Sequence, residues 1–353
     1  MTVFKNAKLF GETVDIEVSD GKITFIGKSD MAGIDLGGND VFPGLVDIHS
    51  HGCVGSDTMD GDRLGEMSLY EAKNGVTSWY PTTVTMDEET IKRAVNVPIG
   101  KTDGANILGF HLEGPYVSKK YKGAQNEEFI REPDICEFKR FDNIKVVTIA
   151  PEMPGAIEFI KNCGVKVSIG HTEADYDTAI EAIEAGASCL THTFNAMPPL
   201  HHREPGVIGA AVEKNIYVEV ISDGIHLHPS VVKMLYKIFG KERMILISDS
   251  MRATGMPDGE YDLGGQMMSV KSGVARTPEG SIAGSTTNLF GCVKKAIEFG
   301  IPRFDAYYMA SATPSKFMGI EKGTLKTGAD ADFIVVDGGD NLIMTVVGGR
   351  IIK

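Results

Sequence analysis

Two histidines separated by a single serine follow a short apolar segment in PGLVDIHSHG, the sequence of residues 43–52. In an extended segment side chains alternate between two faces, so His49 and His51 are predicted to point the same way. Two imidazoles on one face can bind one metal ion. They can equally be polar residues at the point where a strand leaves the core, and their spacing alone leaves both interpretations open.

Eight short apolar segments occupy the middle of the chain, and helical patterns such as DYDTAIEAIEAGA separate several of them. This alternation is typical of parallel βα units, and eight units predict a (β/α)8 TIM-like barrel of the α/β class. An open doubly wound sheet is the structural alternative, but no G-x-G-x-x-G turn follows the first segment. The predicted strands are 41–48, 76–83, 106–112, 145–150, 166–170, 189–194, 216–221 and 244–248.

Side chains that can bind metals stand at the C-terminal ends of five of these strands, where barrel enzymes place their chemistry. Each has a structural explanation of its own; a carboxylate can cap a turn or a helix, for example. Their shared position at one rim favours a metal-dependent hydrolase, and four imidazoles with two carboxylates suit Zn²⁺ or Fe²⁺ better than Mg²⁺ or Ca²⁺. The six residues are His49, His51, Glu113, His171, His192 and Asp249.

Both ends of the chain are rich in β-type sequence. TVDIEVSDGKITFIG alternates polar and apolar residues around an Asp20–Gly21 turn, which is a hairpin signal, and ADFIVVDGGDNLIMTVVGGRIIK has similar character. We therefore expect a small β-sandwich domain formed by residues 1–42 and 320–353, and a barrel domain of residues 43–319. Residues 255–283 are expected to form a turn-rich insertion after the eighth strand.

The composition limits the choice of partners. The formal net charge of -13 disfavours nucleic acid and anionic membranes, although a few local cations can still hold a small anionic substrate. The five cysteines include no C-x-x-C pair, which indicates reduced thiols in a cytoplasmic protein. No run of about 18 apolar residues, the length of a membrane-spanning helix, occurs in the sequence.

The motifs PGLVDIHSHG, HLEGP, GHTEADY, THTFNAM, REPG, DGIH and ISDS occur in this order. Together they resemble the amidohydrolase superfamily and, within it, the family of N-acetylglucosamine-6-phosphate deacetylases, over residues 1–353. The resemblance implies hydrolysis of N-acetyl-D-glucosamine 6-phosphate to D-glucosamine 6-phosphate and acetate, in amino-sugar catabolism or cell-wall recycling. It also implies a homodimer.

The same resemblance implies a division of roles among the rim residues. Glu113, His171 and His192 match the family's principal metal site. His49 and His51 would complete a second site with Glu113 as the bridge, so that one or two divalent ions bind per subunit. Asp249 would act as general base and then as general acid. His111 is expected to be a hydrogen-bonded barrel residue beneath the metal.

Further residues match the family's substrate contacts. Arg203 matches a phosphate-binding arginine, and its structural alternative is an ion pair with Glu204. His226 matches a second phosphate contact, which is expected to serve the neighbouring active site across the dimer interface. The remaining implied contacts are Ala124, Gln125, Asn195, Ala196, Asp223, Ile282, Ala283 and Gly284.

One residue departs from the pattern of some relatives, in which a histidine polarises the substrate carbonyl. Gln125 stands here, and its amide can donate a hydrogen bond but carries no charge. Either Gln125 performs a weaker version of this role, or the second metal polarises the carbonyl. Three other functions stay open: deacetylation of N-acetylgalactosamine 6-phosphate, another amidohydrolase activity such as that of a dihydroorotase or an aminoacylase, and a non-catalytic scaffold.

Overall fold

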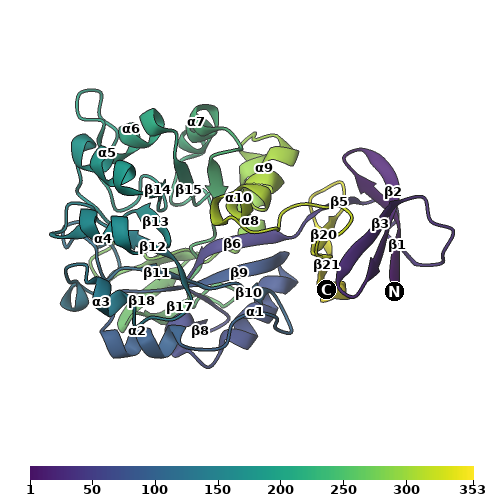
Figure 1. Cartoon of the computed structure of the whole chain (residues 1–353), viewed down its shortest axis with the longest axis horizontal. Helices are drawn as coiled ribbons and strands as arrows, with labels where there is room; N and C mark the ends of the chain where they lie inside the picture. The colour runs from purple at the N-terminus through teal and green to yellow at the C-terminus, as the bar shows by residue number, and fades with distance from the viewer.

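Eight parallel strands form a nearly closed barrel in the computed structural model, which describes all 353 residues (Figure 1). The first two strands are paired, and each later strand pairs with its predecessor, which confirms the predicted barrel. In order they are β6 (Leu45–Ser50), β9 (Val76–Thr83), β11 (Phe110–Glu113), β12 (Ile144–Ile149), β13 (Lys166–Ile169), β14 (Ala187–Leu190), β15 (Tyr217–Val220) and β16 (Met244–Leu246).

The first and last strands meet without a continuous ladder. At the carboxyl end, the backbone N–H of Asp249 donates to the carbonyl of His49 over 2.9 Å. At the other end, helix α10 (Ala312–Met318) contacts both β6 and β16, and its Phe317 is fully buried among the side chains inside the barrel. Burial of such an aromatic side chain contributes roughly 1.5–3 kcal/mol, so α10 acts as an apolar plug at this gap.

Three strand predictions were wrong in extent. Predicted strand 41–48 is interrupted at Gly44, where an added Cβ would lie 2.2 Å from the Thr77 side chain. Its first part, β5 (Asp40–Pro43), leaves the barrel. Predicted strand 106–112 is interrupted at Gly109, where φ is +146°, and leaves β10 (Asn106–Ile107) as a separate strand. Predicted strand 189–194 ends at Leu190, because the chain turns sharply at His192.

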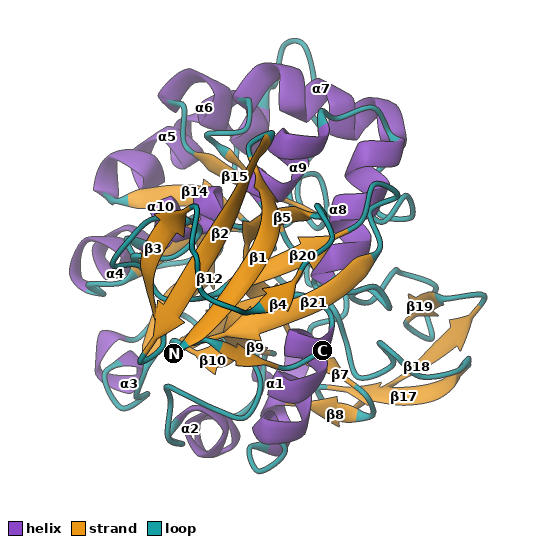
Figure 2. Cartoon of the chain, turned by 90° about the vertical axis from the view of Figure 1, so that its right-hand side faces the viewer, coloured by secondary structure: helices purple, strands orange, loops and turns teal.

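Strands from both ends of the chain join in one eight-stranded sheet beside the barrel (Figures 1 and 2). The predicted hairpin is confirmed: Asp20 and Gly21 both have positive φ, the geometry of a tight hairpin turn. The ring centroids of Phe4 and Phe333 lie 4.9 Å apart, so the two ends share one core. The remaining strands of this sheet are β1 (Thr2–Leu9), β2 (Glu12–Ser19), β3 (Lys22–Gly27), β4 (Ile34–Asp35), β20 (Phe333–Val336), β21 (Leu342–Val347) and β22 (Arg350–Ile351).

Helices surround the barrel, and local sequence explains where they begin and end. For α5, the predicted helix, the Asp175 side chain accepts from the Thr178 N–H, and Gly186 ends the helix with a φ of 129°. The helices are α1 (Leu64–Lys73), α2 (Glu88–Val95), α3 (Ile135–Phe138), α4 (Ala156–Asn162), α5 (Tyr176–Ala185), α6 (Gly206–Lys214), α7 (Pro229–Phe239), α8 (Leu289–Glu298), α9 (Arg303–Met309) and α10. None of these helices is both long and apolar enough to cross a membrane.

The insertion after the eighth strand is an antiparallel sheet of three strands: β17 (Gly259–Leu263), β18 (Gln266–Lys271) and β19 (Val274–Arg276). Its apolar side chains, including Leu263 and Met268, pack on Val84 and Met251 near the barrel mouth. The insertion therefore forms one side wall of the barrel mouth. Two short strands, β7 (Gly52–Cys53) and β8 (Ser56–Asp57), and the 3₁₀ helices η1 (Thr58–Asp60) and η2 (Glu127–Phe129) complete the chain.

Candidate metal centre

A cavity of about 410 Å³ opens at the carboxyl end of the barrel strands. It contains most of the residues predicted to form the site, although they come from widely separated parts of the chain. His49 is fully buried beneath it. The predicted residues that line the cavity are His51, Glu113, Ala124, Gln125, His171, His192, Asn195, Ala196, His226, Asp249, Ile282 and Gly284.

Sharp turns place three of these side chains. His171, His192 and Asp249 follow the ends of their strands and have φ values of 47°, 26° and 47°. Residues other than glycine rarely adopt this left-handed backbone, and it clusters at functional sites where surrounding structure holds it. Here the backbone of Asp249 is held by the hydrogen bond to β6 described above.

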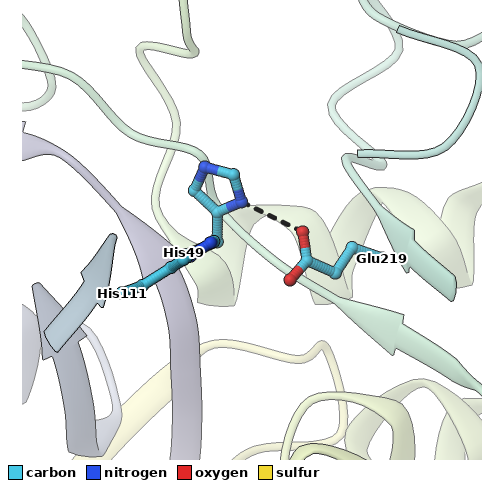
Figure 3. Close-up of side chains that lie close together, drawn as sticks. All are labelled: His49, His111 and Glu219. Carbon is cyan, nitrogen blue, oxygen red and sulfur yellow. Dashed lines mark hydrogen bonds and ion pairs between the residues drawn. The ribbon is translucent and has the colours of Figure 1, made fainter. Parts of the chain in front are cut away.

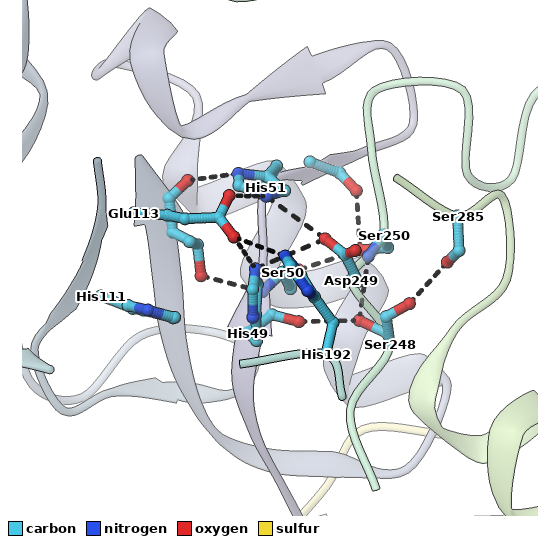
Figure 4. A network of polar contacts seen from close by, with 12 residues as sticks. His49, Ser50, His51, His111, Glu113, His192, Ser248, Asp249, Ser250 and Ser285 are labelled. Carbon is cyan, nitrogen blue, oxygen red and sulfur yellow. Dashed lines mark hydrogen bonds and ion pairs between the residues drawn. The ribbon is translucent and has the colours of Figure 1, made fainter. Parts of the chain in front are cut away.

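The carboxylate of Glu113 lies among four imidazoles, of which Figure 4 shows those of His49, His51 and His192. Its Oε1 lies 3.0 Å from Nε2 of His192 and 3.3 Å from Nε2 of His171. Its Oε2 lies 3.2 Å from Nε2 of His51, while Nε2 of His49 lies 3.4 Å from Oε1. The carboxylate thus contributes to two groups that can each hold a metal ion.

Hydrogen bonds to the other ring nitrogen prepare three of these histidines as metal ligands. Nδ1 of His171 lies 2.9 Å from the Tyr121 carbonyl, and Nδ1 of His51 lies 3.2 Å from the Thr82 carbonyl. Nδ1 of His49 lies 3.0 Å from the carboxylate of Glu219. Because these oxygens only accept, each Nδ1 must carry a proton, which leaves the Nε2 lone pair free for a metal.

The surroundings of the buried Nε2 atoms also indicate that these histidines can hold a metal ion. Nε2 of His49 is buried and makes no hydrogen bond in the structure. Nε2 of His171 and Nε2 of His192 lie only 3.1 Å apart, both facing Glu113. Burial opposes protonation of His51, but Asp249 and Glu113 outweigh it and raise the pKa of His51 to about 9. The centre therefore attracts positive charge, and a nitrogen and oxygen donor set of this kind suits Zn²⁺ or Fe²⁺.

Asp249 faces the cavity from the opposite side of the cluster. Its Oδ1 lies 3.3 Å from Nε2 of His51 and 3.4 Å from Nε2 of His49. Burial opposes ionisation, but the charges of His49 and His51 lower the pKa of Asp249 to about 2. The carboxylate is therefore ionised at neutral pH and able to accept a proton.

The inference from sequence missed Glu219, which stands on β15 and is fully buried. Figure 3 shows its bond to His49. The same Oε2 also accepts from the backbone N–H of His192 over 3.2 Å. His49, His111 and Glu219 form a third group of possible ligands. His111, however, already bonds the Ile48 carbonyl and the Thr148 hydroxyl, as the sequence led us to expect, so this group supports His49 from below. The signal in the sequence was one acidic residue inside the apolar IYVEVI.

Three of the predicted substrate contacts differ in how they lie relative to the cavity. His226 lines the cavity of its own chain, with Nδ1 2.7 Å from Oδ2 of Asp223, and its contact with a neighbouring active site stays a prediction. Asp223 orients His226 and does not line the cavity itself. Ala283 is fully buried in the apolar cluster under the insertion, whereas its neighbours Ile282 and Gly284 reach the cavity.

The cations near the cavity are few. Arg203 is exposed in a separate hollow, where it contacts Nε2 of His202 over 2.7 Å and makes no ion pair with Glu204. Lys120, which the sequence analysis did not single out, is the only lysine or arginine that lines the cavity. Its ammonium group lies 3.1 Å from the carboxylate of Glu173, and both side chains are exposed.

A buried cluster of histidines and carboxylates at the mouth of a (β/α)8 barrel defines the class of metal-dependent hydrolases with this fold. The chain belongs to the amidohydrolase family, whose sequence model matches residues 41–352. An N-acetylglucosamine-6-phosphate deacetylase of Vibrio furnissii is 40% identical over 348 residues, 93% of this chain and 87% of that protein.

Two further comparisons bear on the substrate. An N-acetylgalactosamine-6-phosphate deacetylase of Escherichia coli is 36% identical over 342 residues, 92% of this chain and 90% of that protein. The crystal structure of N-acetyl-D-glucosamine-6-phosphate deacetylase from Mycobacterium smegmatis superposes with a TM-score of 0.92 at 33% identity and covers 100% of both chains.

Proposed function

We propose that this protein is a metal-dependent hydrolase that deacetylates N-acetyl-D-glucosamine 6-phosphate, releasing D-glucosamine 6-phosphate and acetate. The observation that carries the proposal is the Glu113 carboxylate between two histidine pairs, opposite the ionised Asp249 in one cavity. The relatives named above supply the substrate class. A non-catalytic scaffold does not account for a buried cluster in which each potential ligand faces the same carboxylate.

One or two divalent ions, Zn²⁺ or Fe²⁺, are proposed to occupy this centre. Glu113, His171 and His192 would hold the first ion, and His49 and His51, with Glu113 as the bridge, would hold the second. A bound divalent ion lowers the pKa of water towards roughly 7 and polarises an amide carbonyl, which are the two difficulties of amide hydrolysis at neutral pH.

The proton transfers are assigned to Asp249. An ionised carboxylate beside the cavity can take the proton of the attacking water and pass it to the leaving nitrogen of the amide. Oδ1 of Asp249 lies 3.4 and 3.3 Å from Nε2 of His49 and His51, so the positive charge of an ion held by these histidines would keep Asp249 ionised until that proton arrives. The walls that would hold the sugar come from the insertion, through Ile282 and Gly284, and from the loop of Asn195 and Ala196.

The phosphate requires positive charge, and one chain offers little of it. His226 and Lys120 line the cavity, whereas Arg203 lies outside it. We therefore propose a homodimer in which Arg203 of one copy faces the cavity of the other. The five free cysteines fit the expected cytoplasmic location, where thiols stay reduced.

The direct test is acetate release by metal-quantified protein from three compounds: N-acetylglucosamine 6-phosphate, N-acetylgalactosamine 6-phosphate and unphosphorylated N-acetylglucosamine. We expect the highest kcat/KM on the first and the lowest on the third. Preference for the second would reassign the epimer, and activity on none of them with metal bound would refute the proposed substrate class.

A further inference from the structure

Both ends of the Gln125 amide are bonded at the edge of the metal cluster. Its Oε1 accepts from the backbone N–H of Thr85 over 2.7 Å, and its Nε2 donates to Oε2 of Glu113 over 2.7 Å. A backbone N–H can only donate and an ionised carboxylate can only accept, so the two partners fix which end of the amide points where. The side chain is 5% exposed, so water does not compete freely for these bonds.

The loop that carries Gln125 is also held in place. The backbone N–H of Gln125 donates to the Lys122 carbonyl over 2.9 Å, which closes a turn. The amide of Gln266, on strand β18 of the insertion, donates to the carbonyl of Ala124 over 2.8 Å. Two hydrogen bonds therefore fix the backbone at Ala124 and Gln125, from which the Gln125 side chain reaches Glu113.

The bond to Gln125 determines how Glu113 is shared. Terminal carboxylate torsions are broad, so a free glutamate could present either oxygen, or both, to one histidine pair. With Oε2 bound by Gln125 and 3.2 Å from His51, Oε1 is left for His171 and His192. The Gln125 amide thus holds the Glu113 carboxylate so that Oε2 faces His51 and Oε1 faces His171 and His192.

We infer that Gln125 is a positioning residue that orients Glu113 as the bridge between two ions, and that it is needed mainly for the second ion at His49 and His51. This inference rests on the metal centre of the proposed function and deepens it. It favours the second of the two roles that the sequence left open, in which the metal centre would polarise the substrate carbonyl, because one amide hydrogen of Gln125 is committed to Glu113.

The test compares Gln125→Met, which removes both bonds at similar length, with Asn126→Ala, which removes the neighbouring, partly exposed amide that caps η2 and makes no contact with the metal cluster. Metal-free protein is titrated with Zn²⁺ in competition with a chromophoric chelator, and bound metal is counted by mass spectrometry. We expect two ions in the wild type and in Asn126→Ala. In Gln125→Met the first ion should be retained while the Kd of the second rises about 10–100-fold, the usual effect of losing a residue that orients a ligand.

A second variant guards against a folding defect. Gln125→Asn keeps the amide but is too short to reach both Thr85 and Glu113, so it should also weaken the second ion. The absorption spectrum of the Co²⁺-substituted proteins reports the geometry of each site without any turnover. Two ions of unchanged affinity in both variants, or a single ion in the wild type, would overturn the inference.

Measuring the kcat of Gln125→Met in excess metal distinguishes a residue that positions Glu113 from one that acts directly on the substrate. If Gln125 acts through the second ion, saturating Zn²⁺ should restore the kcat of Gln125→Met to near the wild-type value. Extra metal cannot replace a hydrogen-bond donor to the substrate carbonyl. A persistent loss of kcat with both metal sites filled would therefore show that Gln125 touches the substrate. Failure of the wild type to release acetate would instead count against the proposed substrate, and the metal titration would be unaffected.

Discussion

The carboxylate of Glu219 lies 3.0 Å from Nδ1 of His49, and both side chains are fully buried beneath the cavity. This contact fixes the proton of His49 on Nδ1 and turns its free Nε2 towards Glu113 and Asp249. The same oxygen of Glu219 accepts from the backbone of His192, so one carboxylate supports ligands of both proposed ions.

Glu219→Gln should therefore weaken metal binding without removing any ligand. A neutral amide in this place makes the imidazole less basic, and loss of such a partner typically costs about 10–100-fold in metal affinity. The measurement is Zn²⁺ affinity by competition with a chelator, with Glu213→Gln on the surface of α6 as the control. If Glu219→Gln binds both ions as tightly as the wild type, Glu219 has only a packing role.

Asp249→Asn should abolish most turnover while leaving the protein loaded with metal. The amide keeps the shape of the side chain but cannot accept the proton of the attacking water, so kcat should fall about 10²–10⁴-fold. Steady-state acetate release at saturating substrate, together with metal content, makes the test. A small loss of kcat with full metal content would assign the base to another group, and a loss of metal would assign Asp249 a ligand role.

Arg203 provides a test of the proposed homodimer. Arg203→Ala should raise KM for the phosphorylated substrate about tenfold or more, the usual contribution of a charged hydrogen bond. If Arg203 serves the other copy, mixing this variant with Asp249→Asn should restore activity at low substrate concentration. About a quarter of the sites would be complete after random pairing of a twofold dimer. Each variant alone, at the same total concentration, is the control, and no recovery after subunit exchange would place Arg203 in its own chain's site or in none.

The sequence predicted the barrel and its metal-binding rim because both depend on local order. Apolar segments that alternate with helical patterns specify parallel strands, and the C-terminal ends of such strands meet at one rim wherever the residues stand in the chain. What it could not predict depends on distances across the fold. Lys120 was recognised only through its place in the cavity lining, and the acidic Glu219 in its apolar strand gained a role only through its contacts with His49 and His192. The glycine at position 44 is required by the close approach of Thr77, a partner 33 residues away in the chain that the local pattern does not identify.

The sheet formed by both ends of the chain has a buried acidic residue whose charge should stabilise it. Asp15 accepts from the backbone N–H groups of Ser29 and Asn6 and from the ammonium group of Lys5, each over 2.9 Å. The bond from Ser29 is the main cause that lowers the pKa of Asp15 to about 2, and Lys5 and Asn6 add to it against the opposing effect of burial. Since the pKa in the unfolded chain is roughly 3.9, this stabilisation is complete above that pH.

Asp15→Asn should accordingly destabilise the protein at neutral pH by about 1–3 kcal/mol, because an amide oxygen is a weaker acceptor and leaves Lys5 without its counter-charge. The wild type binds this proton more weakly when folded than when unfolded, so its advantage should shrink as the pH falls from about 4 towards about 2. Urea denaturation of both proteins at pH values across this range gives the difference, with Asp20→Asn at the exposed hairpin turn as the matched control. A difference that stays constant down to the lowest pH would mean that the Asp15 charge does not stabilise the sheet.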